Sequence, residues 1–158
     1  MQEADMFLTI LLIIHVIGVI MWIGGVSFVT MVIFPMMYRT GGSLEKALLF
    51  QGVEHRFAGI VRWLIGIVGA TGLCILYVKY GFAILLEMRG VGILIMIIVW
   101  LLYTVIILSE RKIFGKIFAD PHKTDMNKAL RTINLMHWFL LLISFSAVAA
   151  GIWFSHSG

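Results

Sequence analysis

The chain has 158 residues, of which 61% are hydrophobic and only 13% are charged, and its mean hydropathy is +1.05. This composition excludes an ordinary soluble domain, in which about 25% of the residues are charged. The apolar runs are continuous, and they exceed the roughly 20 residues with which a helix crosses a bilayer. We therefore expect an all-α integral membrane protein, a four-helix transmembrane bundle that forms one domain over residues 1–158.

We expect the four helices at residues 7–37, 57–80, 90–109 and 135–154. Pro35 and the glycines that follow it close the first helix, which is long enough to tilt or to project past the membrane. Residues 44–54 mix charged and aliphatic side chains, which favours a segment lying in the interface before the second helix. The start MQEAD lacks the basic residues of a signal peptide, so we expect the first helix to be retained.

The basic residues are distributed unevenly over the expected loops. Ten of the twelve Lys and Arg lie in or near the first loop and the third loop, and only Lys79 and Arg89 lie near the second. Cytoplasmic loops of membrane proteins carry an excess of Lys and Arg. The sequence therefore predicts a protein of the inner (plasma) membrane whose two termini lie outside the cytoplasm.

The first helix carries a stripe that combines one imidazole and one indole with small residues. On a helix that turns 100° per residue, one face collects His15, Gly18, Trp22, Gly25, Val26 and Val29. We expect this face to meet a flat group or a closely packed neighbour.

Two of the five histidines, His15 and His137, fall at membrane depth, where an ionisable side chain is costly and indicates function. His55 is expected near the interface, whereas His122 and His156 lie in polar surroundings and need no role. At about 1.5 Å per residue, His15 lies about 12 Å inside the outer end of its helix. His55 and His137 both lie near the cytoplasmic ends of theirs. They form the natural axial pair for a cofactor, and His15 would need another ligand or belong to a second site.

A zinc site is not indicated, because the sequence has no Cys cluster and no HExxH motif. Imidazoles from different helices beside glycines favour b-type haem, and Arg56 and Arg62 could hold its propionates or else extend to the lipid headgroups. The ten methionines raise copper as the alternative, since its monovalent ion takes thioether and imidazole ligands. No nucleotide-binding loop, catalytic triad or nucleic-acid motif is present, and the single Cys74 gives no internal disulfide.

The pattern H-x6-W-x-G-G-x2-F-x6-P resembles the first helix of the copper-resistance D (CopD) membrane domain. It is formed by His15, Trp22, Gly24, Gly25, Phe28 and Pro35. The layout also resembles the related HemJ protoporphyrinogen oxidase, a four-helix haem protein. The residues that carry this second likeness are His15, Trp22, Glu54 to Phe57, Arg131 and Asn134. The chain departs from the oxidase at the end of helix 1 and along helix 3, so the resemblance implies the fold and a role for His15 rather than a reaction.

From these features we expect a b-type haem protein that transfers electrons within the membrane, with quinone or a partner subunit. The expected cofactor ligands are His15, His55 and His137, with Trp22, Arg56 and Arg62 beside them. Two alternatives remain open. The chain could be a CopD-like protein that transports or handles copper, or a cofactor-free structural subunit of a membrane complex. Glycines on several helix faces are compatible with a homo-oligomer, and whether the chain catalyses a reaction of its own stays open.

Overall fold

The computed structural model describes residues 2–39, 41–117 and 125–156, without the side chains of residues 2, 4, 43, 110–117, 155 and 156. His122 lies outside the described residues, as does the side chain of His156. The described part of the chain is helical apart from short turns, and it contains four helices long and apolar enough to cross a membrane. This confirms the all-α prediction and the expected number of such helices.

The first long helix is continuous from α1 (Gln2–Phe28) through the π-helical turn η1 (Val29–Ile33) into α2 (Phe34–Arg39). In the wider turn, the N–H of Phe34 bonds to the carbonyl of Val29, five residues back. Pro35 follows directly, and a proline both lacks an N–H donor and crowds the carbonyl four residues before it. A π turn at this point accommodates the proline without ending the helix.

The second long helix is α3 (Ser43–Ile75), extended by the π-helical turn η2 (Leu76–Tyr80). The prediction that residues 44–54 precede this helix as a separate segment is wrong, because they form its first turns. The N–H of Gly42 donates to Glu45 Oε2 at 3.3 Å, which satisfies one donor at the helix start. The buried residues also continue at helical spacing through the predicted boundary, at Ala47, Phe50, Ala58 and Val61.

The third and fourth long helices are α4 (Val91–Ile117) and α5 (Met126–His156), both longer than predicted. The connection from η2 to α4 contains the short 3-10 helices η3 (Phe82–Leu86) and η4 (Met88–Gly90). Gly81 turns the chain there with φ 71°, a conformation that favours glycine.

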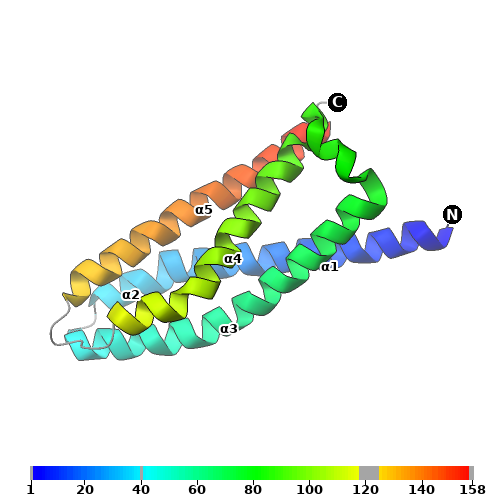
Figure 1. Cartoon of the computed structure of the whole chain (residues 1–158). Coiled ribbons are helices and arrows are strands. Elements are labelled where there is room, and N and C mark those ends of the chain that lie inside the picture. Colours follow the sequence, from blue (N-terminus) through cyan, green and yellow to red (C-terminus); the bar gives the residue numbers. More distant parts are fainter. Residues whose placement is uncertain (1, 40, 118–124, 157–158) are drawn as a thin grey trace.

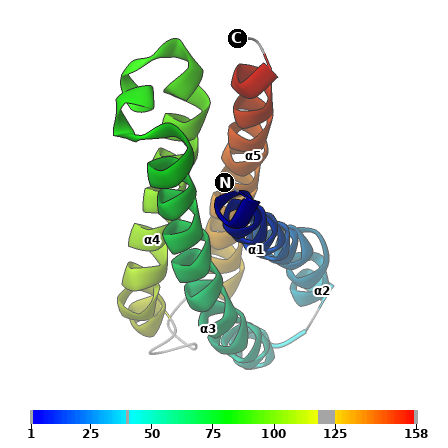
Figure 2. The ribbon, with the colours of Figure 1, turned by 90° about the vertical axis from the view of Figure 1, so that its right-hand side faces the viewer.

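The four helices form two hairpins, since α1 packs mainly on α3 and α4 packs mainly on α5. Figures 1 and 2 show that the hairpins converge where α2 ends and where α3 and α5 begin. We call this end of the bundle the basic end, because Arg39, Lys46, Lys128 and Arg131 lie there. At the opposite end, the N-terminus of α1 lies apart from the C-terminus of α5 (Figure 1).

The stripe predicted on the first helix is the face that packs on α3. Gly18, Trp22, Val26 and Val29 are all buried. A Cβ at Gly18 would lie 2.8 Å from Val68 Cγ2, so the two helices approach closely at that point. The stripe therefore packs against a helix. This agrees with the expectation of a closely packed neighbour rather than a flat group.

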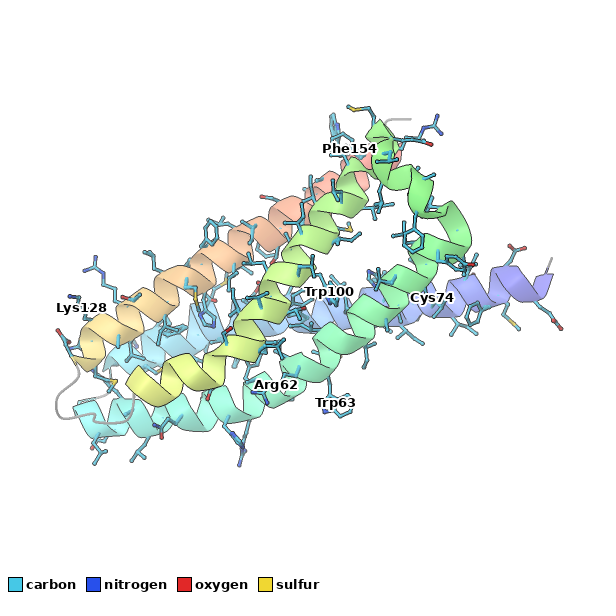
Figure 3. The ribbon with its side chains drawn as sticks, in the orientation of Figure 1. Arg62, Trp63, Cys74, Trp100, Lys128 and Phe154 are labelled. Atoms are coloured by element: carbon cyan, nitrogen blue, oxygen red, sulfur yellow. The ribbon has the colours of Figure 1, made fainter. Side chains whose placement is uncertain are left out.

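The contact between α3 and α4 depends on Trp100, which points from α4 into the bundle (Figure 3). Its indole N–H donates to the carbonyl of Ile65 at 2.9 Å. Gly69 makes room for the ring, because a Cβ there would collide with it. Trp63 lies on the outer side of α3 and is 78% exposed.

Candidate functional site

A cavity of about 70 Å³ lies where the two hairpins meet, towards the basic end. All four long helices contribute to its lining, which is mostly apolar. The chemically distinctive residues of the lining are Met37, Glu54, Tyr103, Met136 and His137. The space is equivalent to roughly five water molecules, since one water needs about 10–15 Å³.

His137 is the only one of the three predicted histidine ligands in this lining. Its Nδ1 lies 2.9 Å from the carbonyl oxygen of Ile133, one turn earlier on α5. A carbonyl can only accept, so Nδ1 carries the proton and donates, and Nε2 keeps a lone pair. The ring also meets the edge of Phe34 with centroids 5.2 Å apart. The imidazole is therefore held in the tautomer that a metal-ligating histidine usually has.

Two thioethers share the lining with this imidazole. Met37 comes from α2 and is 1% exposed, while Met136 precedes His137 on α5 and is half-buried. The π turn η1 lies one turn before Met37, and two of its residues, Val29 and Ile33, line the same cavity. Because a π turn adds a residue to the helical repeat, it sets which later residues of this helix face inward. The turn thus helps to direct Phe34 and Met37 towards α5.

Tyr103 lines the cavity from α4, and its hydroxyl contacts Ser144, a residue outside the lining. Its oxygen lies 3.0 Å from Ser144 Oγ, and Ser144 donates to the carbonyl of Leu140 at 2.7 Å. Since the serine proton is used there, Tyr103 is the donor to Ser144. The ring of Tyr103 also meets Trp22 edge-on with centroids 4.6 Å apart. The indole N–H of Trp22 is buried and has no hydrogen-bond partner among the described residues.

His15 occupies a separate site between α1 and α3. Its Nδ1 lies 3.1 Å from the carbonyl of Val68 and 3.0 Å from Thr71 Oγ1. Thr71 itself donates to the carbonyl of Ile67 at 2.7 Å, so His15 Nδ1 must be the donor to both groups. Gly72 leaves the space that the ring needs, because a Cβ there would lie 3.0 Å from His15 Cε1. The imidazole is half-buried and, like that of His137, has its lone pair on Nε2.

The structure does not bring His55 together with His137. His55 and Arg56 are exposed on α3, Arg62 is half-buried, and none of the three lines the cavity. The inward face of α3 follows Ala58, Val61, Ile65 and Val68 at helical spacing, and His55 lies off that stripe. In the structure, the exposed His55 does not share the cavity lining with His137, and the pairing of the two as axial ligands stays a prediction.

Glu54 was named above only as part of the family resemblance and not as a site residue, although the helical period indicated its inward position. Glu54 stands four residues before Ala58 and seven before Val61, so it shares the inward face of α3 that its neighbour His55 does not. Met37 and Met136 gave a weaker signal. Methionine is a common packing residue, and only the tertiary structure brings these two beside an imidazole.

The cavity does not fit a b-type haem. Pockets for organic ligands occupy about 300–1,000 Å³, several times the volume present here. The described residues also contain no group of three or more His, Cys, Asp or Glu arranged to hold a metal ion. A metal ion bound in the cavity would need the thioethers of Met37 and Met136 as ligands in addition to His137.

Comparisons with protein-family models, with curated proteins and with solved structures found no match. The likeness to the CopD domain and to the HemJ oxidase stays a prediction.

Proposed function

We propose that this chain is a plasma-membrane protein that binds monovalent copper between its two hairpins and takes part in copper transport or handling. The observation that carries the proposal is the cavity, whose lining brings together His137, Met37 and Met136. Of the two predicted functions that require a bound group, haem or copper, copper needs the smaller space. The haem protein with its quinone or partner subunit needs more space than the cavity offers.

The ligand chemistry suits a soft monovalent cation. Thioether and imidazole groups favour Cu(I) over harder ions such as Mg²⁺ and Ca²⁺, which prefer oxygen ligands. Glu54 also lines the cavity, but it already takes part in another interaction. We assign ligand roles to His137, Met37 and Met136.

The orientation follows from the charge distribution. With the basic loops in the cytoplasm, the basic end of the bundle faces inward, and the cavity lies on the cytoplasmic side of the protein. Copper would exchange with the cytoplasm there. His15 lies in a separate place between α1 and α3 and does not line the cavity.

The test is a copper titration of the purified full-length protein under reducing, anaerobic conditions, in competition with a chromophoric Cu(I) chelator. We expect one ion per chain. The double variant Met37→Leu with Met136→Leu, which keeps most of the side-chain volume, should weaken the affinity at least about tenfold. The matched control is Met31→Leu, because Met31 is 51% exposed on η1 and does not line the cavity.

Three results would contradict the proposal. Equal copper affinity in the double variant and the wild type would show that the thioethers of Met37 and Met136 are not copper ligands. A Soret band at one haem per chain in the purified protein would restore the haem prediction. A colourless protein that binds no copper would favour the structural subunit.

A further inference from the structure

A second candidate site is an open groove of about 440 Å³ at the basic end, between α2 and α5. It is separate from the copper cavity and shares no lining residue with it. Its lining consists of Tyr38 from α2 and, from α5, Asn127, Arg131, Asn134, Leu135 and Trp138. These α5 residues form one stripe along the helix. The groove combines polar groups at one end with apolar side chains at the other.

The hydrogen bonds around the groove determine which polar atoms remain for a ligand. Lys46 Nζ donates to Asn127 Oδ1 at 2.7 Å, and because an ammonium group only donates, the amide of Asn127 is oriented by this contact. The Asn127 NH₂ group is then left as a donor. Asn134 Nδ2 donates to the hydroxyl of Tyr38 at 3.2 Å, which in turn donates to the carbonyl of Leu130 at 3.4 Å.

Arg131 gives the groove a positive charge. Its side chain is exposed, it lines the groove, and a guanidinium offers up to five N–H donors in a planar fork. Among the described residues of the lining there is no carboxylate. Asn134 Oδ1, an acceptor, is buried and has no hydrogen-bond partner among the described residues. The exposed polar groups of the groove, on Asn127 and Arg131, offer donors and positive charge, which is the complement of an anionic group with several oxygen acceptors, such as a phosphate.

The other end of the groove distinguishes a lipid from a free phosphate. Leu135 and Trp138 follow Arg131 on the same face of α5 in the direction of the expected membrane, and they are 72% and 40% exposed. Tryptophan is enriched at the level of the lipid headgroups, and basic pockets between helices on the cytoplasmic side bind anionic headgroups. A free phosphate would use the donors but leave this apolar surface without a partner.

We propose that this groove binds the phosphodiester headgroup of an anionic glycerophospholipid of the cytoplasmic leaflet. Arg131 and Asn127 contact the phosphate, and Leu135 and Trp138 lie along the glycerol and the upper acyl chain. The proposal rests on the membrane orientation given above but not on copper binding. Loss of lipid binding and loss of copper binding are thus separate outcomes.

The experiment is native mass spectrometry of the full-length protein in mild detergent, titrated with phosphatidylglycerol or with phosphatidylcholine. We expect phosphatidylglycerol to bind at least about fivefold more tightly, the effect of one favourable basic contact. Arg131→Gln should remove that preference. The control is Lys128→Gln, since Lys128 is exposed on the same helix, one turn earlier, and points away from the bundle outside the groove (Figure 3).

Equal binding of the two lipids would overturn the proposal, as would a preference that survives in Arg131→Gln. An equal loss in Lys128→Gln would show attraction to the whole basic end rather than to the groove. Full displacement of phosphatidylglycerol by the same concentration of inorganic phosphate would assign the groove to the free anion instead. Because Arg131 is exposed, its variant should keep the wild-type circular dichroism spectrum and the wild-type copper content.

Discussion

Gly25 of α1 packs tightly against the ring of Phe57 on α3, and this contact gives a sharp test of the packing. A Cβ added at Gly25 would lie 2.7 Å from Cε2 of Phe57, whereas ordinary van der Waals contact begins at 3.4 Å. The helix or the ring must therefore move by about 0.7 Å, the difference between these two distances. Gly24, the preceding residue, has nothing within 4 Å of the same added atom. The two glycines form a matched pair.

We expect Gly25→Ala to be about 1–3 kcal/mol less stable than Gly24→Ala, the usual cost of overpacking a well-packed contact. Replacing glycine in a helix with alanine gains about 1 kcal/mol of helix propensity, but both variants gain it, so it cancels in the comparison. The measurement is reversible unfolding in mixed detergent micelles, followed by far-UV circular dichroism.

A second substitution, at Phe57, tests whether the contact between Gly25 and the Phe57 ring causes the loss of stability. If the collision with the ring causes the loss, combining Gly25→Ala with Phe57→Leu should recover most of the difference, because the shorter side chain frees the space. Gly25→Ala as stable as Gly24→Ala would refute the tight contact between Gly25 and the ring of Phe57. A loss that Phe57→Leu leaves unchanged would assign the strain to another neighbour.

Three further predictions concern topology and buried polar groups. A reporter fused after Gly158 should be exported and one placed in the loop between α4 and α5 should be cytoplasmic; the reverse pattern would invert the proposed orientation. Asn127→Ala should lower the free energy of unfolding by about 1–3 kcal/mol, because it leaves the 8% exposed Lys46 without its acceptor, and adding Lys46→Met should recover most of the loss. Thr71→Val should cost about 1 kcal/mol by removing one acceptor of His15 Nδ1, and an unchanged unfolding midpoint would contradict that contact.

Much of the fold follows from the sequence. Continuous apolar runs leave a chain in a membrane few alternatives to the α-helix, since every backbone N–H and C=O must find a partner within the segment. The stripe on the first helix was also readable, because small residues and an indole recur there at the period of the helix. The predicted start of α3 is wrong, because residues 44–54 carry several charges and look like an interfacial segment. The spacing of the buried Ala47 and Phe50 nevertheless follows the helical period.

The site was decided by the tertiary structure. Depth along each helix can be predicted from residue counts, and in the structure His15 and His137 lie in different places. Rotation about each axis decides which side chains share a space, and on that criterion α3 turns Glu54 inward and His55 outward. The approach of Met37 to α5 depends further on the π turn at Val29–Ile33 and on how the two hairpins converge. A sequence specifies the faces of its helices one at a time, but the choice of ligands depends on which faces meet, and this is determined by packing between segments distant in the chain.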